Sequence, residues 1–213
     1  MTIISHRGFW NLPEEKNTAT AFLRSFVEGF GTETDLRDQN GQLVIAHNPP
    51  LADEKIILFS EFCEIYLKSP VAHLPLALNI KADGLQQLLK REIDKFALKN
   101  FFVFDMSIPD TIGYINESIP IYSRISEYEQ VPAFYEQAAG LWVDAFKGIW
   151  FTPKLIEKYL SDGKQLCFVS PDLHKRDEMT LWKMMKDNRW DKQNHVVLCT
   201  DFPDKATKYF QYE

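Results

Sequence analysis

Two carboxylates, Glu33 and Asp35, alternate along the segment Gly31-Thr32-Glu33-Thr34-Asp35-Leu36-Arg37. If this segment is extended, its period of two points both side chains to the same face of a strand. Two adjacent like charges are unfavourable in a bare fold, so this face requires a cation, an arginine or a substrate beside it. Carboxylate oxygens suit a hard cation such as Mg²⁺ or Ca²⁺, and soft nitrogen and sulfur ligands at metal spacing are missing from the sequence.

Two histidines and two basic residues stand near the ends of other extended runs: His6 with Arg7 after residues 2–5, His47 after residues 43–46, and Lys81 after residues 74–80. A pair of histidines suits general acid and base catalysis near neutral pH. An arginine can hold two oxygens of a phosphate, and a lysine adds positive charge. The combination indicates phosphoryl chemistry. The structural alternative is that Arg7 and Lys81 only neutralise the two carboxylates.

The apolar pattern predicts eight extended runs that each precede a helix. They end near His6, Asp35, Lys81, Asp105, Ser123, Asp144, Ser170 and Asp201. Eight such units predict an α/β protein with a compact TIM (β/α)8 barrel, in which catalytic groups lie at the carboxyl ends of the strands. The pattern also predicts an extended run at residues 119–122 and a helix at 131–138. No linker is apparent, so a single domain over residues 1–213 is expected.

Composition narrows the classes of function. The 213 residues are 45% hydrophobic and carry a net charge of −6, which argues against a nucleic-acid partner. No run approaches the roughly 18 apolar residues of a membrane span, so no integral membrane segment is expected. The amino-terminal residues lack a basic leader, and Cys63, Cys167 and Cys199 form no CxxC pair. A cytoplasmic protein with buried, reduced thiols is therefore predicted.

The sequence resembles the glycerophosphodiester phosphodiesterase family, within the barrels related to phosphatidylinositol phospholipase C. The family pattern matches along nearly the whole chain, at His6-Arg7-Gly8, Pro13-Glu14, Asn17-Thr18, Ala21-Phe22, Gly31, Glu33-Thr34-Asp35, Asn40-Gly41, Val44, His47-Asn48 and Thr200-Asp201-Phe202-Pro203. The resemblance implies cleavage of a small-molecule phosphodiester by a TIM-barrel enzyme.

The sequence departs from the family pattern at three places. Glu15 and Lys16 interrupt the run Pro-Glu-Asn-Thr, and Asn48 replaces an aspartate after the second histidine. More seriously, Asn79-Ile80-Lys81 stands where the family has Glu-x-Lys, so an amide replaces a metal-ligating carboxylate. An amide oxygen still binds Mg²⁺ or Ca²⁺, but with one negative charge fewer. In an alternative register, Lys81 itself occupies the glutamate position and its ammonium group replaces the metal.

The resemblance implies a role for each of these residues in hydrolysis of a glycerophosphodiester to a phosphomonoester and an alcohol. His6 and His47 would be the acid and base pair, in an order that the sequence leaves open. Glu33, Asp35 and Asn79 would hold the divalent cation, and Arg7 and Lys81 would bind the substrate. Two alternatives remain: a barrel that binds a phosphodiester without turnover, and a lyase-type phospholipase that forms a cyclic phosphate.

Overall fold

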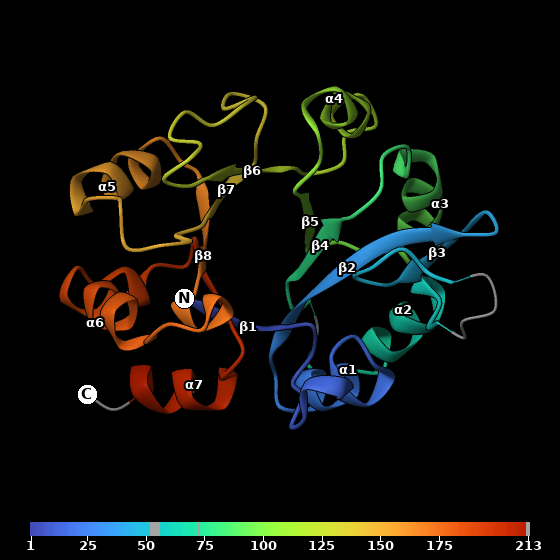
Figure 1. Cartoon of the computed structure of the whole chain (residues 1–213), viewed down its shortest axis with the longest axis horizontal. Coiled ribbons are helices and arrows are strands. Elements are labelled where there is room, and N and C mark those ends of the chain that lie inside the picture. Colours follow the sequence, from blue (N-terminus) through green and yellow to red (C-terminus); the bar gives the residue numbers. More distant parts are fainter. Residues whose placement is uncertain (52–55, 72, 212–213) are drawn as a thin grey trace. The chain divides into compact units, whose positions relative to one another are not determined.

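The structure is a computed structural model that describes residues 1–51, 56–71 and 73–211. The chain divides into two compact units. The first comprises Met1–His6 and Tyr122–Glu213, and the second comprises Arg7–Ile121. Each unit is an α/β structure in which strands alternate with helices along the chain (Figure 1).

Five parallel strands form the sheet of the first unit, in the order β1-β9-β8-β7-β6. They are β1 (Thr2–His6), β6 (Tyr122–Ile125), β7 (Gly140–Val143), β8 (Gln165–Val169) and β9 (Val196–Thr200). The helices of this unit are α5 (Pro153–Ser161), α6 (Met179–Asp187) and α7 (Pro203–Gln211), with short 3-10 helices η2 (Pro171–His174) and η3 (Trp190–Lys192). The core is rich in aromatic rings, of which Phe168 and Trp190 stack with 5.4 Å between their centroids. Because the strands are parallel, their carboxyl ends lie along one edge of this sheet.

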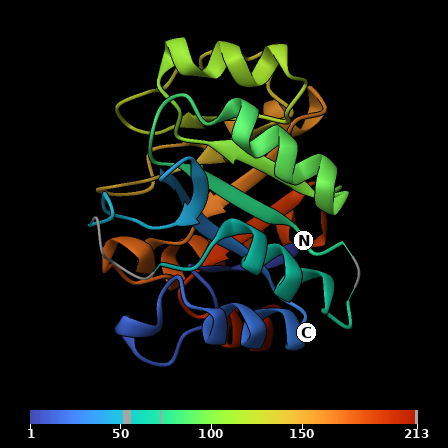
Figure 2. The ribbon, with the colours of Figure 1, turned by 90° about the vertical axis from the view of Figure 1, so that its right-hand side faces the viewer.

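In the second unit, three parallel strands form the order β5-β4-β2, and β3 pairs antiparallel with β2. The strands are β2 (Gly31–Gln39), β3 (Gln42–Ile45), β4 (Leu76–Ile80) and β5 (Phe101–Phe104). The helices are α1 (Ala19–Val27), α2 (Phe59–Leu67), α3 (Gln86–Phe96) and α4 (Ile108–Asn116), with the 3-10 helix η1 (Pro13–Glu15). Helices α1 and α2 lie side by side (Figure 2). They pack together through the rings of Phe22, Phe26 and Phe62.

The sequence placed candidate catalytic residues at the ends of several predicted strands, and all of these strands are present. The predicted α/β class is confirmed. The turn signal Asn40-Gly41 does connect β2 to β3, and both residues have positive φ, as a tight hairpin requires. The three cysteines are buried and form no disulfide, as predicted.

The structure differs from the prediction at three places between residues 105 and 138. The expected helix at 131–138 is a series of turns, because Pro132 and the positive φ of Phe134 are incompatible with a continuous helix. Helix α4 was missed, although Ser107 caps its first turn. The extended run at 119–122 instead begins at Tyr122, three residues later.

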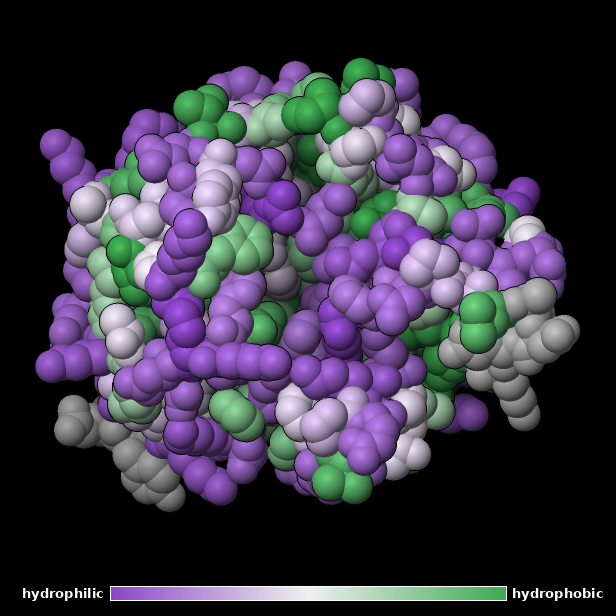
Figure 3. Space-filling model, viewed as in Figure 1, coloured by the Kyte–Doolittle hydropathy of each residue, from purple (hydrophilic) through white to green (hydrophobic). Residues whose placement is uncertain are grey.

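Hydrophilic side chains predominate on the face drawn in Figure 3, and its hydrophobic side chains form small, separate patches. Within the part of the chain that the structure describes, no helix is long and apolar enough to cross a membrane.

Candidate active site

The turn His6-Arg7-Gly8 follows β1 and carries a constrained backbone. Arg7 has a φ of 61°, which is uncommon for a residue with a side chain, and Gly8 has a φ of 85°. The amide of Arg7 donates to the carbonyl of Glu33 at 2.9 Å, and the amide of Asn17 donates to the carbonyl of Arg7 at 2.9 Å. These bonds fix the backbone of Arg7 beside β2, so its guanidinium group reaches the carboxylate of Asp35.

Asp35 lies at the centre of a cluster of polar side chains and is fully buried. Its Oδ2 is 2.9 Å from Arg7 Nε and accepts a hydrogen bond from Asn17 Nδ2 at 2.8 Å. Its Oδ1 is 3.3 Å from His47 Nδ1 and 3.5 Å from Lys81 Nζ. Burial by itself would raise the pKa of this carboxyl group, but the positive charges of Arg7 and Lys81 hold it below its usual value. Asp35 is therefore an anion that joins four side chains from separate segments.

Glu33 lies two residues earlier on β2 and is also buried, as the alternation predicted. Burial and the negative charge of Asp35 raise the pKa of Glu33 to about 8, although Arg7, Lys81 and a hydrogen bond from Asn79 act in the opposite direction. Asn79 is the register partner of Asp35 on the neighbouring strand β4. The two carboxylates and the amide therefore lie together, and Asn79, not Lys81, stands opposite Asp35.

The implied divalent cation is compatible with this donor set. No group of three or more histidine, cysteine, aspartate or glutamate side chains converges in the described part of the chain. However, Asn79 Oδ1 is buried and accepts no hydrogen bond from the described residues, so it is an oxygen that a cation could satisfy. Glu33, Asp35 and Asn79 supply the oxygen ligands that Mg²⁺ or Ca²⁺ prefers. Arg7 and Lys81 already neutralise part of the negative charge, so we expect weak cation binding.

His47 is held by Arg7. The Nη2 atom of Arg7 lies 2.7 Å from His47 Nδ1, and a guanidinium group can only donate. The same Nδ1 atom lies 3.3 Å from Asp35 Oδ1, so it contacts one group that only donates and one that only accepts. Arg37 Nε also donates to the backbone carbonyl of His47 at 3.1 Å. These two arginines fix the ring and the backbone of His47 independently.

His6 belongs to the first unit and pairs with a carboxylate on β9's carboxyl end. Its Nδ1 lies 2.7 Å from Asp201 Oδ1. The backbone amide of Asp201 donates to Asp172 Oδ2 at 2.7 Å, and the hydroxyl of Thr200 donates to the same oxygen at 3.0 Å. Burial raises the pKa of Asp172. A neutral His6 that donates from Nδ1 to Asp201 has its lone pair on Nε2.

Four residues of these networks had no predicted chemical role: Asn17, Asp172, Asp201 and His174. Asn17 and Asp201 did belong to the family pattern, so a signal existed for them. Asp172 and His174 lie beyond the end of β8 in η2 and matched no pattern. His174 Nε2 lies 2.7 Å from Asp144 Oδ1, at the end of β7.

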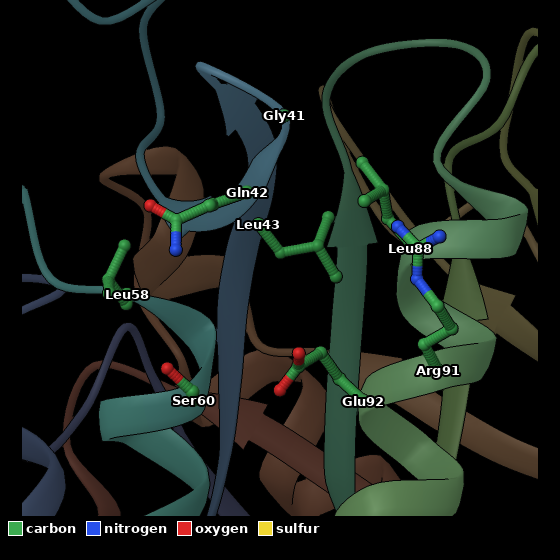
Figure 4. A pocket seen from close by; sticks show the side chains of 8 residues that line it. All are labelled: Gly41, Gln42, Leu43, Leu58, Ser60, Leu88, Arg91 and Glu92. Atoms are coloured by element: carbon green, nitrogen blue, oxygen red, sulfur yellow. The ribbon is translucent and has the colours of Figure 1, made fainter.

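A cavity of about 490 Å³ adjoins the second unit's cluster. Arg7, His47 and Lys16 line one part of it, and Ile45 and Ile57 line another. A smaller cavity of about 90 Å³ lies between β3, α2 and α3 and is lined by none of the predicted site residues (Figure 4). The cavity beside His47 is thus within the size range of about 300–1,000 Å³ typical of small-molecule sites.

The sequence matches no known family profile and no curated protein. Several solved structures resemble the fold. A glycerophosphodiester phosphodiesterase from Parabacteroides distasonis has a TM-score of 0.76 at 15% identity, over 99% of this chain and 96% of that chain. A phosphodiesterase from Oleispira antarctica, in complex with its product sn-glycerol-3-phosphate, has a TM-score of 0.71 at 14% identity, over 99% and 97%. A Ca²⁺-dependent phosphatidylinositol-specific phospholipase C from Streptomyces antibioticus has a TM-score of 0.54 at 9% identity, over 98% and 96%.

At these identities the likeness concerns the fold, and it confirms the predicted α/β TIM-barrel fold. One barrel fold hosts many activities, so the function of this chain depends on the residues of its site.

Proposed function

We propose that this protein is a phosphodiesterase that hydrolyses a glycerophosphodiester to a phosphomonoester and an alcohol. The observation that carries the proposal is the cluster in which Arg7, Lys81 and His47 surround Asp35. Cleavage of a phosphodiester requires positive charge beside the phosphoryl oxygens and groups that transfer protons. Arg7 and Lys81 would supply the charge, and His47 would transfer a proton. The phosphodiesterase fold and the product bound in the Oleispira enzyme support the choice of substrate class.

Arg7 and Lys81 bind the phosphoryl oxygens in this proposal. Both are partly exposed at 20% of their side-chain area, while Asp35 beneath them is fully buried. The carboxylate therefore orients the two cations from below, and their remaining N–H groups face the ligand. Positive charge that is already oriented stabilises the additional charge that develops on the phosphoryl oxygens in the transition state.

The two histidines have distinct roles in this proposal. His6 donates from Nδ1 to Asp201, which leaves the lone pair on Nε2 that a general base requires. His47 would serve as the general acid in its imidazolium form, in which the Nδ1 proton faces Asp35 Oδ1 at 3.3 Å and Nε2 carries the proton that is transferred. His6 would remove a proton from the nucleophile, and His47 would protonate the departing alcohol. Asp201 acts as a positioning residue that fixes the tautomer of His6.

Glu33, Asp35 and Asn79 are the residues that would hold a divalent cation, Mg²⁺ or Ca²⁺. When bound, the cation would offset negative charge on the phosphoryl oxygens. A reducing compartment is also part of the proposal, and it is supported by the three buried cysteines that form no disulfide.

Product analysis by phosphorus NMR tests the proposal. Purified protein is incubated with a panel of glycerophosphodiesters, with Mg²⁺, with Ca²⁺ and with EDTA. Glycerol phosphate is the expected product, whereas a cyclic phosphate would identify a lyase. His6→Ala and His47→Ala should each lower turnover at least 100-fold without loss of fold, because each removes a proton-transfer group. His73→Ala, in a loop outside the cluster, is the control. Ligand-dependent stabilisation without any product would instead indicate a binding protein.

A further inference from the structure

The cavity beside His47 continues into a second cavity along the surface of the second unit. The second has a volume of about 400 Å³ and lies against α2, where Ile65 and Lys68 line it. The two cavities share three lining residues, Ala19, Ile56 and Ile57. A ligand with its phosphate at Arg7 could therefore extend past Ala19 toward α2.

The side chains that line the two cavities change from cationic to apolar along this path. At the first end stand Arg7, Lys16 and His47, and beyond them the lining includes Ile45, Ile57 and Ile65. Glu61, Glu64 and Lys68 lie on the α2 side, where the groove meets solvent. A groove that is cationic at one end and rich in isoleucine along its length fits an amphiphile with an anionic head.

Helix α1 extends the same surface. Ala19 begins this helix, and Leu23, one turn later, is 51% exposed. Val27 follows after another turn and is 57% exposed. Residues four apart lie on one helix face, so Ala19, Leu23 and Val27 form an apolar stripe that leads away from the shared part of the two cavities.

We propose that the substrate carries a hydrocarbon chain, and that this chain lies in the groove between α1 and α2. The inference rests on the proposed function and deepens it, because it makes the substrate class a phosphodiester with one apolar chain. A small glycerophosphodiester would fill only the cationic end. Continuity with the cluster at Arg7 and His47 is the reason to assign the groove to the substrate rather than to another protein.

The test compares glycerophosphodiesters that differ only in the length of one alkyl chain, all short enough to remain monomeric in solution. One series carries the chain on the glycerol and a second carries it on the leaving alcohol, so the two sources of the chain are distinguished. In one series, kcat/KM should rise with each methylene by at most about fourfold, the factor that corresponds to about 0.8 kcal/mol of burial. Turnover that is equal at every chain length in both series would overturn the inference and leave the proposed function intact.

A matched pair of variants tests where the hydrocarbon chain of the substrate binds. Ala19→Trp fills the part that the two cavities share, whereas Thr20→Trp places the same ring at the neighbouring exposed position, which lines neither cavity. Ala19→Trp should abolish the dependence of kcat/KM on chain length, whereas Thr20→Trp should leave this dependence and the turnover of the chainless substrate unchanged. Should Ala19→Trp fail to fold, Ile65→Gln with Leu67→Gln as control makes the same comparison on α2.

Binding by calorimetry separates this inference from the proposed function. Propyl, hexyl and decyl phosphate are titrated into the protein, with inorganic phosphate as the chainless probe. Affinity should rise along the series even if no diester is cleaved. Equal affinity for decyl phosphate and inorganic phosphate would overturn the inference, whatever the activity.

Discussion

Asp35 and Asn79 face each other across β2 and β4, and the difference between these two side chains sets the charge of the site. Asp35 is surrounded by four nitrogen atoms, whereas the buried oxygen of Asn79 receives no hydrogen bond from the described residues. A carboxylate at position 79 would add a negative charge beside Glu33 and Asp35. If the site holds a cation as proposed, its affinity should therefore depend on this one amide.

Asn79→Glu should strengthen binding of Mg²⁺ or Ca²⁺ by roughly tenfold, because ligand charge tunes the affinity of oxygen sites. Calorimetric titration of each metal measures the effect without reference to activity. The same variant should lower the thermal midpoint in EDTA, since a further carboxylate is then buried beside Asp35, and the added metal should restore it. Asn79→Gln is the control, because it has the length of glutamate without its charge. Equal metal affinity in the two variants would contradict this reading.

At the scale of single residues, the sequence predicted which side chains form the cluster around Asp35 better than it predicted the contacts between them. Period-2 alternation was sufficient to place Glu33 and Asp35 on one face, and the extended runs brought Asn79 and Lys81 to the neighbouring strand. The ion pair of Arg7 with Asp35 was the structural alternative that the sequence offered. The contact of Arg7 with His47 could not be predicted, because it depends on the positive φ of Arg7 and on the hydrogen bond to Glu33. The partner of His6 was equally hidden, since Asp201 is 195 residues away along the chain.

The turn that connects β1 to α1 depends on Gly8. A Cβ atom there would lie 2.7 Å from the Cβ of Ala21, which is fully buried in α1. The close approach brings the amino-terminal part of α1 against this turn, and the amide of Gly8 donates to the hydroxyl of Thr32 at 3.0 Å. The geometry of the Arg7 turn is thus coupled to the position of α1.

Gly8→Ala should lower the free energy of unfolding by about 2–5 kcal/mol, as measured in urea. About 1–2 kcal/mol comes from the left-handed backbone, and the overpacking against Ala21 adds about 1–3 kcal/mol. Gly84→Ala is a matched control, because Gly84 has the same φ of 85° but no atom within 4 Å of the added Cβ. Gly84→Ala should lower the free energy of unfolding only by the roughly 1–2 kcal/mol of the left-handed backbone. Equal losses in the two variants would show that the contact with Ala21 is unimportant.

At the scale of elements, strands were predictable where apolar runs were bounded by turn residues, and α4 shows where that approach failed. The sequence Ile108-Pro109-Asp110-Thr111-Ile112-Gly113 contains a proline and a glycine, so it resembles a loop. The helix forms because Ser107 caps it and because Gly113 allows close packing against Gln86, to which an added Cβ would approach within 2.9 Å. Tertiary packing of this kind is not visible in local sequence.

The stability of the whole chain should depend on pH through Asp172. Burial raises the pKa of this carboxyl group in the folded protein, so above pH 4 the unfolded chain loses this proton while the folded chain retains it. The unfolded state then binds fewer protons, and stability falls as pH rises until the raised pKa is passed. The stabilisation is complete below the ordinary carboxyl pKa.

Asp172→Asn isolates this contribution, because the amide does not titrate. Urea unfolding of both proteins between pH 4 and pH 7 should show the advantage of the native protein over the variant shrinking as pH rises, by at most about 1.4 kcal/mol per unit. Asp204→Asn, at an exposed position on α7, is the control and should leave the pH profile unchanged. Parallel profiles for Asp172→Asn and the native protein would exclude this role.

The pair formed by His6 and Asp201 joins residues 195 positions apart, and β1 pairs only with β9 inside the first unit. The sequence between them must therefore have been synthesised and folded before this histidine acquires its orienting carboxylate. Closing so long a loop is entropically costly and belongs to the late steps of folding. Residues 7–121, by contrast, are contiguous, so the cluster around Asp35 can assemble on the nascent chain first. A chain folded only this far would then hold Arg7, Lys81 and His47 in place without an oriented His6.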